Sequence, residues 1–300
     1  MRILVSGSAG LVGSAFARVS RGEGDEVLRL VRRPAKAADE VSWDPSSGAA
    51  PDLAAIDGVD AVVHLAGAGI GDHRWTAAYK REIRDSRVRS TGLLASTLAR
   101  LDRPPRVFLS GSAVGYYGDA GDAEVDENSP AGEDFLADVV KEWEAAAAPA
   151  IDAGIRTVCL RSGIVMSTRG GALGKVLPLF RAGLGARLGS GRQYVSWIAR
   201  PDHISALRFL LTSDDVSGAV NVTAPNPVTN AEYTKEIAAA VHRPALLISP
   251  PAALRVALGE FADTVVTGQR VLPTRLLDAG FTFGYPELGP ALRALLDSQS

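Results

Sequence analysis

The sequence has little cysteine, little net charge and no long apolar run. Cys159 is the one cysteine among 300 residues, so an intrachain disulfide and a zinc site built from several thiolates are excluded. It stands in the apolar run at 157–160, which indicates a buried thiol. The formal net charge of −2 gives no electrostatic footprint for nucleic acid, and we expect no nucleic-acid partner.

Signals for a membrane or a metal are absent from the sequence as well. No uncharged stretch approaches the roughly 18 residues of a membrane-spanning helix, and no basic segment with an apolar core precedes the first expected strand. We therefore expect a soluble, cytoplasmic protein without a membrane partner. The four histidines lie in separate segments without the spacing of metal ligands, so no metal site is predicted.

A glycine-rich turn directly follows the first apolar segment. Residues 2–6 indicate a strand, and the following Gly-Ser-Ala-Gly-Leu-Val-Gly opens an apolar-periodic helix. This arrangement presents backbone N–H groups at a helix N-terminus to a diphosphate, whereas an ordinary glycine-rich loop is the structural alternative. We expect a dinucleotide site that includes Gly7, Ser8, Ala9, Gly10, Leu11, Val12 and Gly13.

Strands and helices alternate over the first two thirds of the chain. Apolar runs predict strands at 2–6, 26–31, 61–66, 106–110, 156–160 and 218–222, and helical periodicity predicts helices at 14–21, 79–101 and 135–153. Such alternation is typical of an α/β protein with a Rossmann-type, doubly wound parallel sheet. We expect a dinucleotide-binding domain at 1–162, to which 198–224 returns, and a smaller substrate-binding part at 163–197 and 225–300.

The end of the second expected strand selects the cofactor. A site that prefers NAD has a carboxylate there for the ribose hydroxyls, whereas this chain has Val31 followed by Arg32 and Arg33. Two guanidinium groups favour a 2′-phosphate, so the sequence predicts NADP(H) in preference to NAD(H). The alternative is that the two arginines merely cover an exposed strand end.

Two further segments are expected beside the cofactor. Leu65, Ala66 and Gly67 follow the third expected strand and would form the wall near the adenine ribose and the pyrophosphate. Asp44 could accept a hydrogen bond from the adenine amine, although an Asp before a proline is equally a turn former.

Several motifs, in this order along the chain, resemble the landmarks of extended short-chain dehydrogenase/reductases. The glycine turn at 7–13 is followed by DAVVHLAG at 60–67, SGSAVGYYG at 110–118 and LRSG at 160–163. Narrower signatures at 189–193, 196–198, 221–225, 268–273 and 280–283 resemble the atypical epimerase-family branch, often called nucleoside-diphosphate-sugar epimerase-like. The resemblance spans essentially the whole chain. It implies further cofactor-binding residues at Arg87, Ser110, Arg161, Ser162 and Gly163.

The chain departs from that resemblance in its catalytic residues. Typical members use a Ser or Thr, a Tyr and a Lys four residues later, and Ser112 matches the first. The family spacing puts Leu136 and Val140 where the Tyr and the Lys should stand, and none of the six tyrosines has a lysine four residues on. Candidates to supply the proton instead are Tyr116, Tyr117 and Lys175.

The second half is expected to close the substrate pocket. Gln193 lies in a glycine-rich segment that resembles a substrate-gripping loop, and Trp197 could stack on a flat ligand. Asp202 is expected to cap a helix.

Three functional hypotheses follow from the sequence. The first is a hydride-transferring oxidoreductase that acts on a small carbonyl or hydroxyl substrate without the usual acid/base pair. The second is a catalytically silent NADP(H)-binding sensor that regulates a partner. The third, a sugar-nucleotide epimerase with the normal mechanism, is the weakest hypothesis because the Tyr is missing. The sequence also leaves open whether the protein forms a homodimer.

Overall fold

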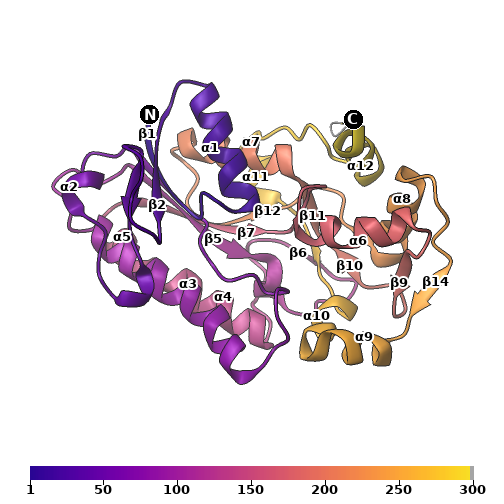
Figure 1. Ribbon diagram of the computed structural model, residues 1–300. Coiled ribbons are helices and arrows are strands. Elements are labelled where there is room, and N and C mark those ends of the chain that lie inside the picture. The colour runs from indigo at the N-terminus through magenta and orange to yellow at the C-terminus, as the bar shows by residue number, and fades with distance from the viewer. Residues whose placement is uncertain (298–300) are drawn as a thin grey trace.

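A parallel sheet of seven strands forms the centre of the computed structural model, which describes residues 1–297 (Figure 1). The order in space is β12-β7-β5-β4-β1-β2-β3. β1 pairs with both β2 and β4, so the strand order reverses there, and ligands of such sheets bind at this reversal. The strands are β1 (Arg2–Ser6), β2 (Glu26–Val31), β3 (Glu40–Ser42), β4 (Ala61–His64), β5 (Val107–Ala113), β7 (Arg156–Ser162) and β12 (Gly218–Val222).

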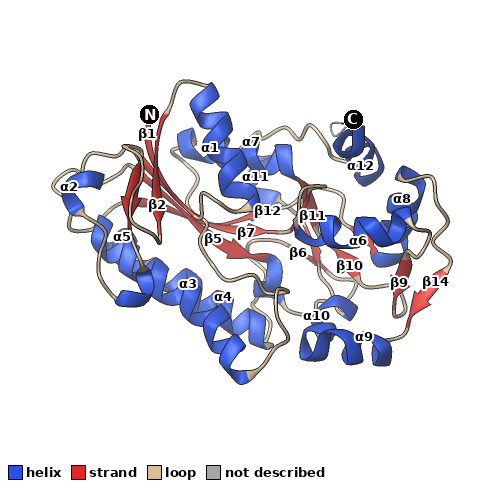
Figure 2. Ribbon diagram, in the orientation of Figure 1, coloured by secondary structure: helices blue, strands red, loops and turns tan. Residues whose placement is uncertain are grey.

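Helices cover both faces of the sheet because alternate side chains of each strand point to opposite faces. In β5, Val107 and Leu109 pack in one core with helices α1 (Leu11–Gly22), α7 (Arg200–Thr212) and α11 (Thr274–Asp278). Phe108 belongs to a second core on the opposite face, and helices cover this face as well (Figure 2). The helices on that face are α2 (Leu53–Ile56), α3 (Ala77–Leu98), α4 (Phe135–Ala145) and α5 (Ala148–Asp152).

The remaining elements form a cap beside the carboxyl edge of the sheet (Figure 1). A third core holds much of this cap together, and it includes Leu173, Trp197, Ile237 and Leu292. The cap strands are short: β6 (Glu124–Val125), β8 (Ile164–Met166), β9 (Ala186–Leu188), β10 (Tyr194–Val195), β11 (Trp197–Ala199), β13 (Val228–Thr229), β14 (Leu247–Ser249) and β15 (Arg270–Val271). Its helices are α6 (Gly171–Arg181), α8 (Asn230–Ala240), α9 (Pro251–Leu258), α10 (Ala262–Val266) and α12 (Leu288–Asp297), with a single turn, η3 (Gly259–Phe261), before α10. Two further single turns follow strands of the central sheet: η1 (Pro45–Ser47) comes after β3, and η2 (Val114–Tyr117) comes after β5.

The predicted fold class is confirmed, with differences at the ends of some elements. β1, β2 and β12 have the predicted bounds, whereas the single helix predicted over 135–153 is divided into α4 and α5. Pro149 lies in the first turn of α5, where the missing N–H costs no hydrogen bond. No helix within residues 1–297 has the length and apolar character needed to cross a membrane.

Asp202 does not cap a helix, contrary to the prediction. It lies inside the first turn of α7, and the residue before that helix is Ala199. Its carboxylate accepts hydrogen bonds from the backbone N–H groups of Gly284 and Tyr285, at 3.0 and 2.8 Å. Asp202 therefore fastens the segment before α12 to the start of α7.

Candidate functional site

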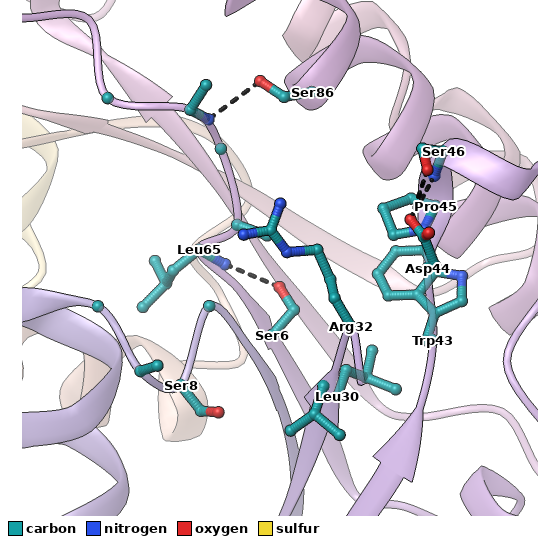
Figure 3. A pocket seen from close by; sticks show the side chains of 18 of the residues that line it. Ser6, Ser8, Leu30, Arg32, Trp43, Asp44, Pro45, Ser46, Leu65 and Ser86 are labelled. Carbon is teal, nitrogen blue, oxygen red and sulfur yellow. Dashed lines mark hydrogen bonds between the residues drawn. The ribbon is translucent and has the colours of Figure 1, made fainter. Parts of the chain in front are cut away.

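A pocket of about 1280 Å³ opens at the carboxyl edge of β1, β2 and β4 (Figure 3). Its walls come from the glycine turn, the end of β2, the segment after β3, the segment after β4 and one side of α3. Ten residues predicted to bind the cofactor line it: Gly7, Ser8, Ala9, Gly10, Arg32, Arg33, Asp44, Leu65, Ala66 and Gly67.

The glycine turn can take its shape only because Gly7 and Gly13 carry no side chain. Gly7 has φ +66°, and a Cβ there would come within 2.7 Å of the Leu65 carbonyl group. A Cβ on Gly13 would overlap the Gly7 carbonyl oxygen, so Gly13 and Val12 serve packing behind the pocket. Gly10 is exposed at the surface of the turn, where a phosphate can approach the backbone. The turn therefore fits a dinucleotide pyrophosphate.

A buried hydrogen-bond chain supports the floor of the pocket. The Nδ1 of His64 lies 2.6 Å from the Ser6 hydroxyl, which accepts a hydrogen bond from the Leu65 N–H at 3.1 Å. On the other side of the ring, Nε2 lies 3.2 Å from the Ser90 hydroxyl. Complete burial lowers the pKa of His64 to about 4, so the ring is neutral at neutral pH. His64 is therefore a structural residue.

The two arginines after β2 have different surroundings. Arg33 makes a bidentate ion pair with Glu40, with N–O distances of 2.7 and 2.6 Å. Hydrogen bonds from Arg33, and then from the Lys36 N–H, lower the pKa of Glu40 to about 2. Arg32 has no hydrogen bond or ion pair within residues 1–297, and its side chain extends into the pocket between Leu65 and Asp44 (Figure 3). Only Arg32 is thus left free to bind an anion there.

Asp44 lines the pocket and also stabilises the turn that follows it. Its carboxylate accepts hydrogen bonds from the Ser46 N–H and hydroxyl, at 3.0 and 2.7 Å, and so caps η1. These bonds, the hydroxyl bond first, lower the pKa of Asp44. The neighbouring Trp43 also lines the pocket and was missed by the sequence analysis, because the preceding Glu-Val-Ser carries no pattern that could have pointed to it.

Arg87 lies behind the pocket wall. Its guanidinium group donates to the Ile83 carbonyl at 3.0 Å and lies 5.1 Å from the centre of the Trp143 ring. A Cβ on Gly67 would come within 3.3 Å of it, so Arg87 packs against Gly67, which lines the pocket. Burial lowers the pKa of Arg87 to about 10. Another residue that the sequence analysis missed is Ser86, whose hydroxyl accepts from the Ala68 N–H at 3.0 Å.

Ser112 belongs to a buried polar network at the ends of β5 and β7. Its hydroxyl donates to Glu144 of α4 at 2.6 Å. The same carboxylate receives two bonds from Arg161, at 2.8 and 2.9 Å, and Arg161 pairs with Ser112 across the two strands. Because Arg161 is only 4% exposed and committed to Glu144, it is not among the residues that line the pocket.

Glu144 is a residue that the sequence analysis did not select. It stands four residues after Val140 and eight after Leu136, so all three lie along one side of α4. Those two positions carry the apolar residues found in place of the missing Tyr and Lys. A carboxylate thus lies one turn beyond them, and the helical spacing was the signal that could have found it.

Tyr116 and Tyr117 differ in what their phenol groups contact. Tyr117 is buried, accepts a bond from Arg161 at 3.1 Å and donates to Asn221 at 2.7 Å. Burial raises its pKa to about 12, although Arg161 and Asn221 oppose that shift. Tyr116 places its ring centre 3.4 Å from the Arg161 guanidinium carbon, and its phenol has no hydrogen bond within residues 1–297. Tyr116 is therefore the phenol left free for a ligand.

Lys175 reaches across from α6 to the segment after β4. Its ammonium group donates to the Gly71 carbonyl at 2.9 Å and pairs with Asp72 at 3.0 Å. Asp72 lines the pocket, so this contact lies at the pocket rim. Both side chains of the pair are more than half exposed, which makes the ion pair weak and easily opened.

Three other predicted cofactor residues lie outside the pocket lining. Ser110 is completely buried, and Ser162 lies 2.9 Å from Nε2 of His203. A Cβ on Gly163 would come within 2.6 Å of the Ser196 carbonyl oxygen, so this glycine permits β7 to pass close to the segment before β11. These residues support the edge of the sheet rather than line the pocket.

The two residues predicted to bind substrate, Trp197 and Gln193, have different surroundings in the structure. Trp197 is completely buried in the core of the cap and donates to the Asn226 carbonyl at 2.9 Å. Its ring has no free face for a ligand, so the predicted stacking is wrong. Gln193 donates from its amide to two carbonyl groups, while its Oε1 is buried without a partner in the described part of the chain.

Comparison with known proteins agrees with the resemblance inferred from the motifs. Residues 3–223 match the model of the NAD dependent epimerase/dehydratase family, and residues 249–295 match a domain of unknown function. The human epimerase family protein SDR39U1 is 36% identical over 99% of this chain and 100% of its own length. An epimerase family protein of Mycobacterium tuberculosis is 46% identical over 97% of this chain and 96% of its own.

Solved structures give the same result. A crystal structure of human SDR39U1 with NADPH has a TM-score of 0.92 at 35% identity and covers 99% of both chains. A nucleoside-diphosphate sugar epimerase from Corynebacterium glutamicum has a TM-score of 0.80 at 36% identity, over 98% of this chain and 58% of its own. The predicted resemblance is confirmed, and the chain belongs to the NAD-dependent epimerase/dehydratase family.

Proposed function

We propose that this protein is an NADP(H)-dependent oxidoreductase that transfers a hydride to or from a small carbonyl or hydroxyl substrate. The observation that carries the proposal is the free guanidinium group of Arg32 in a pocket whose glycine turn fits a pyrophosphate. A relative of 35% identity, human SDR39U1, has been crystallised with NADPH, which supports the same cofactor here. The glycine turn would hold the pyrophosphate, and Arg32 would bind the 2′-phosphate.

The bound nicotinamide would supply or accept the hydride, and the residues at the ends of β5 and β7 would hold the substrate oxygen. Because Ser112 donates its proton to Glu144, its remaining lone pairs suit it to accept a hydrogen bond from a substrate hydroxyl. Tyr116 has the free phenol and is our candidate for proton exchange with the substrate. The Tyr117 phenol already donates one hydrogen bond and accepts another, and it serves to position Arg161.

A second candidate function is an NADP(H)-binding sensor without turnover. The observation in its favour is that Ser112 and Arg161 both donate to Glu144 and that Arg161 also donates to Tyr117, as in a structural network. An oxidoreductase consumes bound NADPH with some member of a broad carbonyl panel, and Tyr116→Phe slows that reaction by roughly 10²–10⁴-fold. A sensor binds both redox forms and turns over nothing in the same panel.

The pair of arginines after β2 gives a matched test of the cofactor. We expect Arg32→Ala to weaken NADPH binding by roughly 10–100-fold and to leave NADH binding unchanged, because it removes a charge-assisted bond to phosphate. Arg33→Ala is the control, since that side chain is held by Glu40, and it changes NADPH affinity less than about threefold on the same reasoning. Calorimetric titration at one salt concentration measures both. An unchanged NADPH-to-NADH ratio in Arg32→Ala would refute the proposed role.

A further inference from the structure

A second, smaller pocket lies on the other side of the glycine turn. It has a volume of about 370 Å³ and shares Ala9 and Gly10 with the first pocket. Three arginines from three separate segments line it: Arg18 from α1, Arg169 from the segment before α6, and Arg200 from the start of α7. Its remaining lining residues are small or apolar, apart from the hydroxyl of Ser14.

The three guanidinium groups lack a counter-ion in the part of the chain that the structure describes. Across residues 1–297, none of them makes an ion pair or a side-chain hydrogen bond. Elsewhere on the same helices, Arg208 of α7 is paired with Glu23 and Asp25, so acidic partners occur nearby but not at this pocket. Three unpaired cations that share one concave surface repel one another, and an anion between them would remove that cost.

The pKa of Arg200 agrees with this arrangement. Its pKa is lowered from the usual value, first by burial and then by the positive charges of Arg169 and Arg18. The two exposed arginines therefore act on Arg200 electrostatically although they come from distant parts of the sequence. A bound anion would offset the repulsion from these two positive charges.

From these observations we propose that Arg18, Arg169 and Arg200 form a second anion site, distinct from the dinucleotide pocket, that binds a phosphate group. Guanidinium groups match phosphate oxygens in geometry and charge, and the three here come from three separate segments of the chain. A volume of about 370 Å³ is at the small end of the range for small-molecule pockets, so the ligand is free phosphate or a small phosphate ester.

Titration of the NADPH-saturated protein tests this site. Inorganic phosphate and glycerol 3-phosphate are titrated separately by calorimetry in a buffer that contains no other polyanion. Heat from inorganic phosphate alone identifies free phosphate as the source, and tighter binding of glycerol 3-phosphate identifies an ester. We expect Arg18→Gln and Arg169→Gln each to weaken the binding by about tenfold or more, since each removes a charge-assisted bond. No binding of either probe overturns the proposal.

Two controls separate this site from general attraction and from the first pocket. Arg181→Gln removes the same charge from an exposed position at the end of α6 outside the pocket, and it should leave phosphate binding unchanged. An equal loss in that variant would mean non-specific attraction and would overturn the site. NADPH affinity is measured in every variant without phosphate. If Arg18→Gln and Arg169→Gln weaken NADPH as much as phosphate, the arginines belong to the dinucleotide pocket, and the second site is refuted.

Discussion

The two ends of the ligand-binding edge differ in how far their polar groups are already occupied. At the open end, beside β1 and β2, the Arg32 guanidinium group has no hydrogen bond or ion pair within residues 1–297 that a ligand would have to displace. At the closed end, beside β5 and β7, Ser112 and Arg161 both donate hydrogen bonds to Glu144. The open end therefore presents a binding surface, whereas the closed end carries a rigid network of polar side chains.

The largest expected effect is at the closed end. Arg161→Met leaves the Glu144 carboxylate buried without its partner, which should lower the free energy of unfolding by about 3–5 kcal/mol. Chemical denaturation followed by circular dichroism measures it. Arg255→Ala, which removes an exposed ion pair with Asp263, is the control and should cost less than about 1 kcal/mol. A comparable loss in both variants would mean that the closed end is not a rigid network.

Acid should destabilise both ends to a similar degree. His64 supports the open end and His203 contacts Ser162 at the closed end, and burial lowers the pKa of each to about 4. In the unfolded chain each takes up a proton below about pH 6.5. The folded protein resists that uptake, so stability is present above that pH and falls as the pH drops towards 4, by up to about 1.4 kcal/mol per pH unit for each histidine.

Urea denaturation at several pH values between 7 and 4.5 measures this slope. His203→Gln should reduce it by up to one histidine's share, and His64→Gln provides the same check at the open end. A slope that both variants leave intact would mean that other groups cause the acid sensitivity.

A glycine comparison within one helix sharpens the account of the open end. Gly13→Ala places a methyl group against the Gly7 carbonyl oxygen, which should cost about 1–3 kcal/mol of stability and weaken dinucleotide binding by distorting the turn. Gly22→Ala meets nothing within 4 Å at the far end of α1 and should be neutral or gain about 0.5–1 kcal/mol. Thermal unfolding with and without NADPH distinguishes the two variants. Normal binding in Gly13→Ala would contradict the role of the turn.

The smallest expected effects come from two serines. Ser112→Ala removes one bond to Glu144 but leaves both bonds from Arg161, so it should cost about 1 kcal/mol. Ser8→Ala removes a side chain that lines the pocket without a hydrogen bond in the described residues, and its stability should stay within about 0.5 kcal/mol. Paired denaturation curves measure both. Equal losses of stability in the two variants would mean that the serines at the two ends do not differ in how much they stabilise the fold.

Much of the open end could be predicted from the sequence because its determinants are local. The glycine turn joins neighbouring elements, and β1 and β2 had apolar runs of the observed length. The different surroundings of Arg32 and Arg33 could not be predicted. They depend on Glu40, the first residue of β3, which lies beside β2 only because this strand of three residues with no pattern of its own pairs with β2.

The closed end depends on contacts between distant segments, which the sequence pattern does not report. Glu144 is 32 residues from Ser112 and 17 from Arg161 along the chain. Trp197 was misread for a related reason, because an aromatic residue after a loop looks the same whether it faces a ligand or a core. The cap strands have only two or three residues each, which is too short for an alternating pattern to predict them. The boundary placed at residue 162 stays a prediction.

The position of β12 affects how the chain can fold while it is being synthesised. This strand completes the sheet by pairing with β7, yet 55 residues of the sequence separate the end of β7 at 162 from the start of β12 at 218. Until residue 222 has left the ribosome, β7 is an open edge that carries the apolar Val158 and Leu160. The nascent chain therefore passes through a stage that is prone to pairing with other chains, and a fragment cut at residue 162 would be held at that stage.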